Sequence, residues 1–317
     1  MAAPAATSQQ QEFLHELIAH GHFLPSGEPG IYGRGMAFER VRTGLDDLIT
    51  RVGAADQPER PRFPPVIPRR MLEKLGYLKS FPQLCGAVFS FAGKGAAALE
   101  LADKAERGED WSSYLSMTNV ALVPAACYPA YPVIAQRGPL PQGGVTLDLG
   151  GCYVFRNEPS GDPARLQMFH QRELVRIGEA AEVYAWRERW MARARSIYEQ
   201  IGLGATIDTA SDPFFGRGGK LMADSQRQQA LKFEALVQIA SPEPTAVSSF
   251  NLHQEAFGLA FGIQLHNGRT ASSSCVGFGL ERITLALFRT HGMETASWPQ
   301  EVQTRLWPES NTAAPGR

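Results

Sequence analysis

Two apolar-rich segments joined by a turn-forming peptide constrain the fold of this chain more than any other feature. Residues 146–158 and 167–177 each have the length and side-chain composition of a strand. The peptide at 159–163 contains two prolines, a glycine, a serine and an aspartate, which is typical of the turn of a hairpin. An antiparallel pair of strands is therefore expected near the middle of the sequence.

The remaining pattern places further strands among helices. We expect strands at residues 88–92, 231–239, 246–252 and 257–265. The spacing of apolar residues predicts helices at residues 12–18, 41–52, 71–75, 96–107, 183–201 and 280–290. Runs of strands flanked by helices favour an α+β fold built on an antiparallel sheet. Residues 1–11 and 307–317 are polar, small or proline-containing, and are expected to be frayed ends.

Charge and cysteine content exclude several classes of protein. The 317 residues carry 31 Lys and Arg against 32 Asp and Glu, a formal net charge of −1, which disfavours non-specific binding to nucleic acid. No apolar stretch approaches the ~18 residues needed to cross a bilayer, and the start of the chain lacks the pattern of a signal peptide. A cytoplasmic protein without membrane contact is expected. Four cysteines in a chain of this length do not indicate a disulfide framework.

Charged and aromatic side chains share one face of the expected hairpin. Arg156 and Glu158 lie two residues apart on the first strand, and Phe169 and Glu173 lie on one face of the second. Arg165 begins the return strand. Guanidinium groups bind phosphate bidentately, an aromatic ring stacks on a base, and a carboxylate accepts from an exocyclic amine, so this set suits a nucleotide. The alternative is a surface hairpin with a solvated ion pair and a core phenylalanine.

A second element lies at residues 277–282. Gly277 and Gly279 allow close approach of a ligand to the backbone. Arg282 falls in the first turn of the following helix, where the helix dipole does not favour a cation, and this position indicates an anion nearby. The alternative is an exposed Arg282 paired with its neighbour Glu281.

We assign no catalytic or ligand-binding role to two other motifs. His15 and His20 are five residues apart, so on a helix they face different directions and do not share a metal ion. The glycine-rich residues 216–220 lack the first glycine and the Ser or Thr of a phosphate-binding loop. We expect them to form a flexible loop.

Together, the two elements resemble the signatures of class II aminoacyl-tRNA synthetases. Residues 155–158 and 165–169 match motif 2, of the form F-R-x-E, loop, R-x-x-x-F, and residues 277–282 match motif 3, of the form G-x-G-x-E-R, about 120 residues further on. The chain is most similar to seryl-tRNA synthetases, because residues 246–249 and Asn251 resemble their strand E-(V/I)-S-S-x-x-N. It departs from that strand in Ala246, which replaces the acid, and in Asn251, which stands one place early.

Three further residues narrow the resemblance. Cys127, Glu173 and Cys275 flank the motifs in the manner of the zinc-containing seryl-tRNA synthetases, and no heptad run precedes the motifs to form the tRNA-binding arm. The family that combines these features is the amino acid:[carrier protein] ligases, which the chain resembles over residues 25–295. Two thiolates and a carboxylate suit zinc with a fourth position open, which the resemblance assigns to the α-amino group of the substrate. The alternative is two buried cysteines in strands; Cys85 and Cys152 are expected in the core.

The resemblance implies an ATP site and a mechanism. It places Arg156 on the α-phosphate, Arg165 and Arg282 on the γ-phosphate, and Phe169 against adenine, with Mg²⁺ bridging the phosphates; the three arginines are the catalytic residues. The ATP-binding set is completed by Glu158, Leu166, Ser248 and Ser249. The implied reaction forms an aminoacyl-adenylate and pyrophosphate, and then transfers the amino acid to the phosphopantetheine thiol of a small carrier protein. The protein is thus expected to be an AMP-forming ligase that uses no tRNA.

The resemblance further implies glycine or alanine as the substrate. The substrate-binding residues are expected to be Glu173, Asp212, Lys232 and Asn251. For Asp212 and Lys232, polar residues between the two motifs, the alternative is a pair of solvated surface charges. Residues 30–48 correspond to motif 1, through which a homodimer is expected.

The expected organisation is an N-terminal extension at 1–24, a catalytic domain at 25–295 and a C-terminal tail at 296–317. Two other functions remain open. One is a tRNA-charging enzyme that grips its tRNA with the first hundred residues. The other is a non-catalytic relative of the synthetases that only binds a partner.

Overall fold

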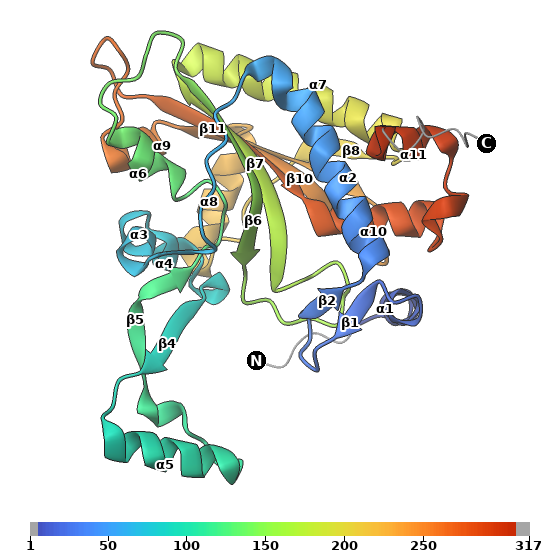
Figure 1. Ribbon diagram of the computed structural model, residues 1–317. Helices are drawn as coiled ribbons and strands as arrows, with labels where there is room; N and C mark the ends of the chain where they lie inside the picture. The colour runs from blue at the N-terminus through green and yellow to red at the C-terminus, as the bar shows by residue number, and fades with distance from the viewer. Residues whose placement is uncertain (1–5, 309–317) are drawn as a thin grey trace, which may run out of the picture.

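A six-stranded sheet forms the centre of the computed structural model, which describes residues 6–308 (Figure 1). The strands lie in the order β6-β7-β11-β10-β9-β8, and all five neighbouring pairs are antiparallel. Their bounds are β6 Val145–Phe155, β7 Met168–Gly178, β8 Thr206–Thr209, β9 Lys232–Val237, β10 Thr245–Gln254 and β11 Ser272–Gly279. The expected α+β fold with an antiparallel sheet is confirmed, and β6 and β7 form the expected hairpin.

One face of the sheet packs against helices. Helices α7 (Ala180–Gln200) and α10 (Leu280–His291) contact the central strands, and α2 (Met36–Gly53) and α11 (Gln300–Leu306) pack outside them. The core on this face includes Leu174 of β7, together with Trp186 and Trp190 of α7. Burial of these large side chains anchors the strands from this side.

The opposite face carries a second, smaller core. Val175 of β7 belongs to it, one residue from Leu174, because successive side chains of a strand point to opposite faces. Helices α6 (Ala130–Ala135) and α9 (Ala256–Phe261) contribute to it. The central strands therefore have core residues toward both faces.

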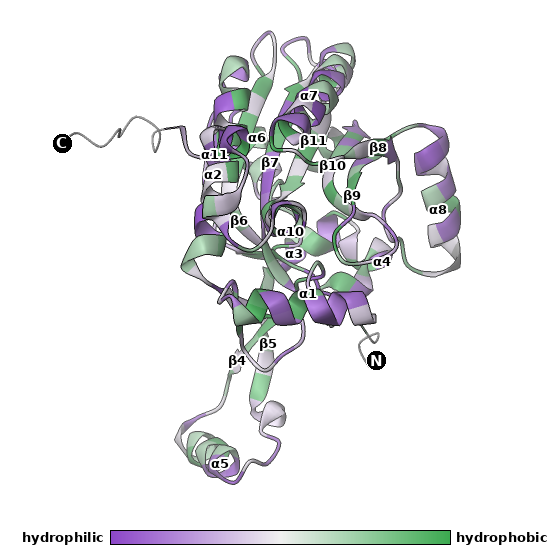
Figure 2. Ribbon diagram, turned by 90° about the vertical axis from the view of Figure 1, so that its right-hand side faces the viewer, coloured by the Kyte–Doolittle hydropathy of each residue, from purple (hydrophilic) through white to green (hydrophobic). Residues whose placement is uncertain are grey.

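An arm projects from the body of the protein (Figures 1 and 2). Its three-stranded sheet has the order β3-β5-β4, and α5 at the tip has no buried residue. The bounds are β3 Val66–Pro68, β4 Ala87–Phe91, α5 Gly95–Glu106 and β5 Leu115–Leu122. Apolar side chains such as Phe89 and Leu99 are exposed here.

Shorter elements complete the chain. They are α1 Ser8–Ala19, β1 Phe23–Pro25, β2 Tyr32–Arg34, α3 Arg69–Lys74, α4 Tyr77–Ser80, α8 Gly216–Gln228, and 3-10 helices at Ala54–Asp56, Pro82–Leu84, Ser112–Tyr114 and Thr295–Ser297. None of the helices formed by residues 6–308 has the length and apolar character required to cross a membrane.

Two local predictions were wrong. Residues 257–265 were expected to form a strand, but helix α9 occupies residues 257–261. Gly258 allows this helix to pack closely against the backbone just before β11, since a Cβ atom there would lie 2.1 Å from the carbonyl oxygen of Ala271. Residues 216–220, expected to be a loop, begin helix α8.

The expected frayed ends are also partly ordered. Thr7 and Gln10 form a capping box that starts α1 at Ser8. Near the other end, the ring of Trp307 stacks on Trp298. The rest of the predicted C-terminal end, residues 309–317, lies outside the described residues, as do residues 1–5.

Candidate active site

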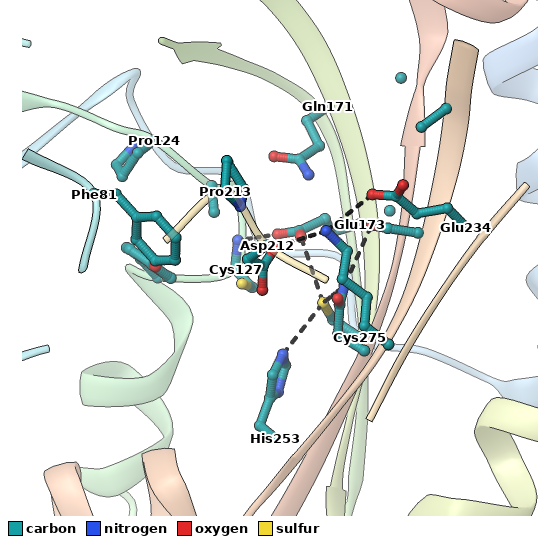
Figure 3. A pocket seen from close by; sticks show the side chains of 18 of the residues that line it. Phe81, Pro124, Cys127, Gln171, Glu173, Asp212, Pro213, Glu234, His253 and Cys275 are labelled. Carbon is teal, nitrogen blue, oxygen red and sulfur yellow. Dashed lines mark hydrogen bonds and ion pairs between the residues drawn. The ribbon is translucent and has the colours of Figure 1, made fainter. Parts of the chain in front are cut away.

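A cavity of ≈ 410 Å³ lies against the face of the sheet that carries the smaller core (Figure 3). Its floor is built from side chains of β7, β9, β10 and β11, and its walls come from residues near α4, α6, α8 and α9. Of the predicted site residues, those that line it are Cys127, Arg156, Phe169, Glu173, Asp212, Lys232, Ser248, Ser249, Asn251, Cys275 and Arg282. The fold thus brings together residues that are far apart in the sequence.

Strand register places the floor residues in rows. Glu173 of β7 lies opposite Gly277 of β11, which lies opposite Ser249 of β10. In the next row, Cys275 lies opposite Asn251, which lies opposite Lys232 of β9. Because Gly277 has no side chain, the centre of the floor stays open between its neighbours.

Cys127, Glu173 and Cys275 form a compact buried cluster. Their ligand atoms all lie within 4.8 Å of one another. The Cys275 thiol donates to Glu173 Oε1 over 3.5 Å, and the backbone N–H of Cys127 donates to Glu173 Oε2. Cys127 lies in a turn before α6 rather than in a strand, so the loop carries its sulfur to the two strand residues.

The electrostatics of this cluster favour protonated side chains while no cation is present. Its hydrogen bond to Cys275, together with burial and the nearby Glu173, raises the pKa of the Cys127 thiol well above its ordinary value. Burial raises the pKa of Glu173. The hydrogen bond from Cys127 lowers the pKa of Cys275, but burial and Glu173 outweigh it and leave that pKa raised. A bound divalent cation would reverse this balance, because it favours thiolate and carboxylate.

An ion-pair network lies beside the cluster. Lys232 Nζ is 2.6 Å from Asp212 Oδ1 and 2.9 Å from Glu234 Oε1. Gln226 of α8 donates to Asp212 Oδ2 over 2.9 Å. Burial alone would raise the pKa of Asp212 and lower that of Lys232, but their mutual attraction shifts each pKa in the opposite direction. Lys232 is buried, so it is not a solvated surface charge.

Two half-buried arginines also line the cavity. The guanidinium carbon of Arg156 lies 5.6 Å from the ring centroid of Phe169. Arg282, in the first turn of α10 as expected, donates to the carbonyl oxygens of Ala164 and Ala246 over 2.8 and 2.9 Å. Burial and the charges of Arg156 and Arg165 lower the pKa of Arg282 to about 10. This accumulation of positive charge suits an anionic ligand.

The proposed alternative pairing of Arg282 with Glu281 is not formed. Glu281 is buried on the other side, where it accepts from Arg34 over 2.5 Å and from the backbone and ring nitrogens of His170 over 2.8 and 2.7 Å. Of these two neighbouring residues of α10, Arg282 therefore lines the cavity, whereas Glu281 binds Arg34 and His170.

Three predicted ATP-binding residues do not line the cavity. Glu158, Arg165 and Leu166 belong to the loop between β6 and β7. Arg165 is exposed and lies 3.8 Å from Asp162, whereas Leu166 is buried in the main core. Glu158 and Arg165 are nevertheless close enough to Arg282 to influence its pKa.

The sequence analysis missed several residues of the cavity, among them Glu234 and His253. Glu234 follows Lys232 by two residues on β9, and His253 follows Asn251 by two residues on β10. The period of two along a strand would have indicated both, because it places them on the same face as residues already singled out. His253 lies 3.5 Å from the Cys275 sulfur (Figure 3).

Comparison with known proteins identifies the family. No protein-family model matches the sequence. Two curated relatives from Bradyrhizobium diazoefficiens, amino acid--[acyl-carrier-protein] ligases 1 and 2, are 46% and 44% identical to the chain. The matches cover 94% and 96% of this chain and 91% of each relative.

A solved structure of M. kandleri seryl-tRNA synthetase, in complex with A. aeolicus tRNASec, is similar with a TM-score of 0.80 and 20% identity. The similarity covers 98% of this chain and 62% of that one. The fold is therefore that of the class II aminoacyl-tRNA synthetases. With nearly half of its residues identical over almost the full length of both relatives, the chain belongs to the amino acid--[acyl-carrier-protein] ligase family.

Proposed function

We propose that the protein activates glycine or alanine with ATP, releases pyrophosphate, and transfers the amino acid to the phosphopantetheine thiol of a small carrier protein. The observation that carries this proposal is a single cavity that is lined both by a compact Cys-Glu-Cys cluster and by two half-buried arginines. The names of the two relatives describe the same kind of ligase.

The arginines would supply charge stabilisation rather than proton transfer. The carboxylate of an amino acid is already a nucleophile toward the α-phosphate of ATP, so the enzyme must position the reactants and neutralise charge. Arg156 is assigned to the α-phosphate of Mg²⁺-bound ATP, and Arg282 with Arg165 to the γ-phosphate. Phe169 would stack on adenine, with Glu158, Leu166, Ser248 and Ser249 completing the nucleotide site.

The donor set of the cluster fits zinc. The ligand atoms of two thiols and a carboxyl lie within 4.8 Å of one another, and the 3.5 Å between Cys275 Sγ and Glu173 Oε1 matches the separation of two ligands in a tetrahedral site with bonds of about 2.0–2.3 Å. When bound, zinc supplies a Lewis acid for the α-amino group of the substrate. Cys127, Glu173 and Cys275 would hold the ion, and Asn251 lies beside Cys275, to whose sulfur it donates over 3.4 Å.

Asp212 and Lys232 are proposed to bound the space for the substrate side chain. Their mutual ion pair leaves a fixed polar wall next to the cluster. Glycine and alanine differ by one methyl group, which an enzyme distinguishes by only ~1–3 kcal/mol, so both belong in the test. The carrier thiol needs no strong base, because a thiol of pKa near ~8.5 is partly ionised at neutral pH.

The decisive experiment measures both half-reactions. ATP–pyrophosphate exchange is measured with each of the twenty amino acids, on protein whose metal content is determined. Labelled amino acid is then offered to a pantetheinylated carrier protein, to the same carrier without pantetheine, and to total tRNA. We expect exchange with glycine or alanine and label on the pantetheinylated carrier alone. Label on tRNA would favour a tRNA-charging enzyme, and absence of exchange with every amino acid would favour a non-catalytic relative.

Two points of organisation remain proposals. We assign the catalytic domain to residues 25–295, and a homodimer through residues 30–48. Light scattering during size-exclusion chromatography tests the second: twice the chain mass of 34.7 kDa is expected, and a monomer contradicts it.

A further inference from the structure

His253 connects the Cys-Glu-Cys cluster to the neighbouring core. It lies on β10, and its Nε2 atom is 3.5 Å from Sγ of Cys275 on the adjacent strand β11 (Figure 3). Its ring lines the cavity. His253 does not belong to the set of groups whose ligand atoms all lie within 4.8 Å of one another. It therefore contacts one member of the cluster from outside.

The other edge of the His253 ring is held by hydroxyl groups. Nδ1 lies 3.1 Å from Ser273 Oγ and 3.3 Å from the hydroxyl of Tyr131. The ring of Phe257 meets it edge-on, with centroids 4.7 Å apart. Contacts at both edges and on one side fix the orientation of the imidazole, as expected of a group that must point at one atom.

The chemistry of a metal-bound cysteine determines which ring nitrogen of His253 carries a hydrogen atom. A cysteine that binds zinc is a thiolate, which accepts hydrogen bonds but cannot donate them. Nε2 must then carry the hydrogen, whether the imidazole is neutral or charged. In the neutral ring, Nδ1 accepts from one of the two hydroxyl groups, each of which can donate.

We propose that His253 is a positioning residue that donates its Nε2–H to the thiolate of Cys275 and so orients this sulfur for zinc. The inference rests on the metal site of the proposed function. Partners of metal ligands typically contribute a factor of about 10–100 to metal affinity. Loss of the donor should therefore weaken metal binding while Cys127, Glu173 and Cys275 all remain.

Cobalt and zinc binding test this role without measuring activity. The purified full-length protein is freed of metal and titrated with Co²⁺, and zinc affinity is measured by competition with a chelator. The variants are His253→Leu, which removes the donor, and His253→Gln, which keeps an N–H donor. His266→Leu is the matched control, because His266 is exposed.

The expected results separate hydrogen bonding from packing. His253→Leu should lower zinc affinity about 10- to 100-fold and move the sulfur-to-cobalt charge-transfer band to longer wavelength, because the hydrogen bond stabilises the sulfur electrons. His253→Gln should restore most of both properties, and His266→Leu should resemble the unchanged protein. The band position does not depend on how much protein is folded, so a partly unfolded variant remains informative.

Three outcomes overturn the inference. Equal losses in the Leu and Gln variants would mean that the ring acts only through packing. An unshifted band with unchanged affinity in His253→Leu would mean that no functional hydrogen bond exists, while the metal site itself stands. If the unchanged protein binds neither Co²⁺ nor Zn²⁺ stoichiometrically, the metal site of the proposed function fails together with this inference.

Discussion

Replacing Lys232 by methionine should destabilise the folded protein. The substitution keeps most of the length of the side chain but removes the cation that lies 2.6 Å from Asp212 and 2.9 Å from Glu234. Only 8% of the Lys232 side chain is exposed, so water cannot replace the ammonium group without rearrangement. Two carboxylates would then face each other with no cation between them.

The loss in the free energy of unfolding can be estimated from the burial of Lys232, Asp212 and Glu234. Removing one partner of a buried ion pair costs about 3–5 kcal/mol. Asp212 and Glu234 keep 32% and 23% of their side-chain surface exposed, so water screens part of their repulsion. We therefore expect a loss of about 2–3 kcal/mol in the free energy of unfolding, which corresponds to a decrease in Tm of about 3–5 °C for a chain of this size.

The contribution of Lys232 and Asp212 to the free energy of unfolding should depend on pH. The pKa of Asp212 is lowered in the folded state, so its contribution to stability is lost as the pH falls through that pKa. The pKa of Lys232 is raised, so its contribution is lost as the pH rises through that pKa. The stability difference between the unchanged protein and Lys232→Met should be full near pH 7 and shrink at both extremes.

Urea unfolding from acid to alkaline pH measures this difference. Lys220→Met is the matched control, because Lys220 is exposed on α8. Equal stability of the two variants at pH 7, or a difference that does not shrink in acid, would refute the argument that Lys232 holds the two carboxylates together.

Three further substitutions test separate parts of the site. Cys275→Ser should remove stoichiometric zinc and abolish amino-acid-dependent pyrophosphate exchange, whereas Cys85→Ser should retain both; undiminished exchange in Cys275→Ser contradicts the role of the metal. Arg282→Ala should raise the KM for ATP about 10- to 100-fold, since hydrogen bonds to charged groups contribute about 1.5–3 kcal/mol, and zinc content should not change; a loss of zinc would mean that the two sites are not separate. Gly277→Ala should raise the KM for the amino acid, because the new Cβ would lie 3.1 Å from Gln171 Nε2 and 3.2 Å from Ser249 Oγ; steady-state kinetics that leave this KM unchanged would show that the floor tolerates a methyl group.

The sequence was most informative where local pattern and chemistry coincide. The hairpin of β6 and β7 follows from two strand-like segments around a turn, and the position of Arg282 follows from the glycines and the apolar helix around it. Alternation along β7 places Phe169 and Glu173 on one face, as the sequence predicted. These features depend on the geometry of one strand or one helix.

The features that the sequence did not predict depend on contacts between different segments of the chain. Residues 257–265 alternate apolar and small residues like a strand, but their first part is helical and packs through Gly258 against the backbone of Ala271. The arm strand β5 was not predicted, because few of its side chains are buried. His253 belongs to no recognised motif, and its contact with Cys275 exists only because β10 and β11 are neighbours.

Successive side chains of β7 face opposite sides of the sheet, and this alternation restricts where residues can be inserted or deleted. Glu173 faces the cavity, whereas the next residue, Leu174, packs among the helices on the reverse side. One inserted or deleted residue upstream within this strand would exchange the two, burying an acid in hydrocarbon and exposing a leucine to the substrate. Engineered libraries that vary chain length should therefore place no insertion or deletion within β7, residues 168–178.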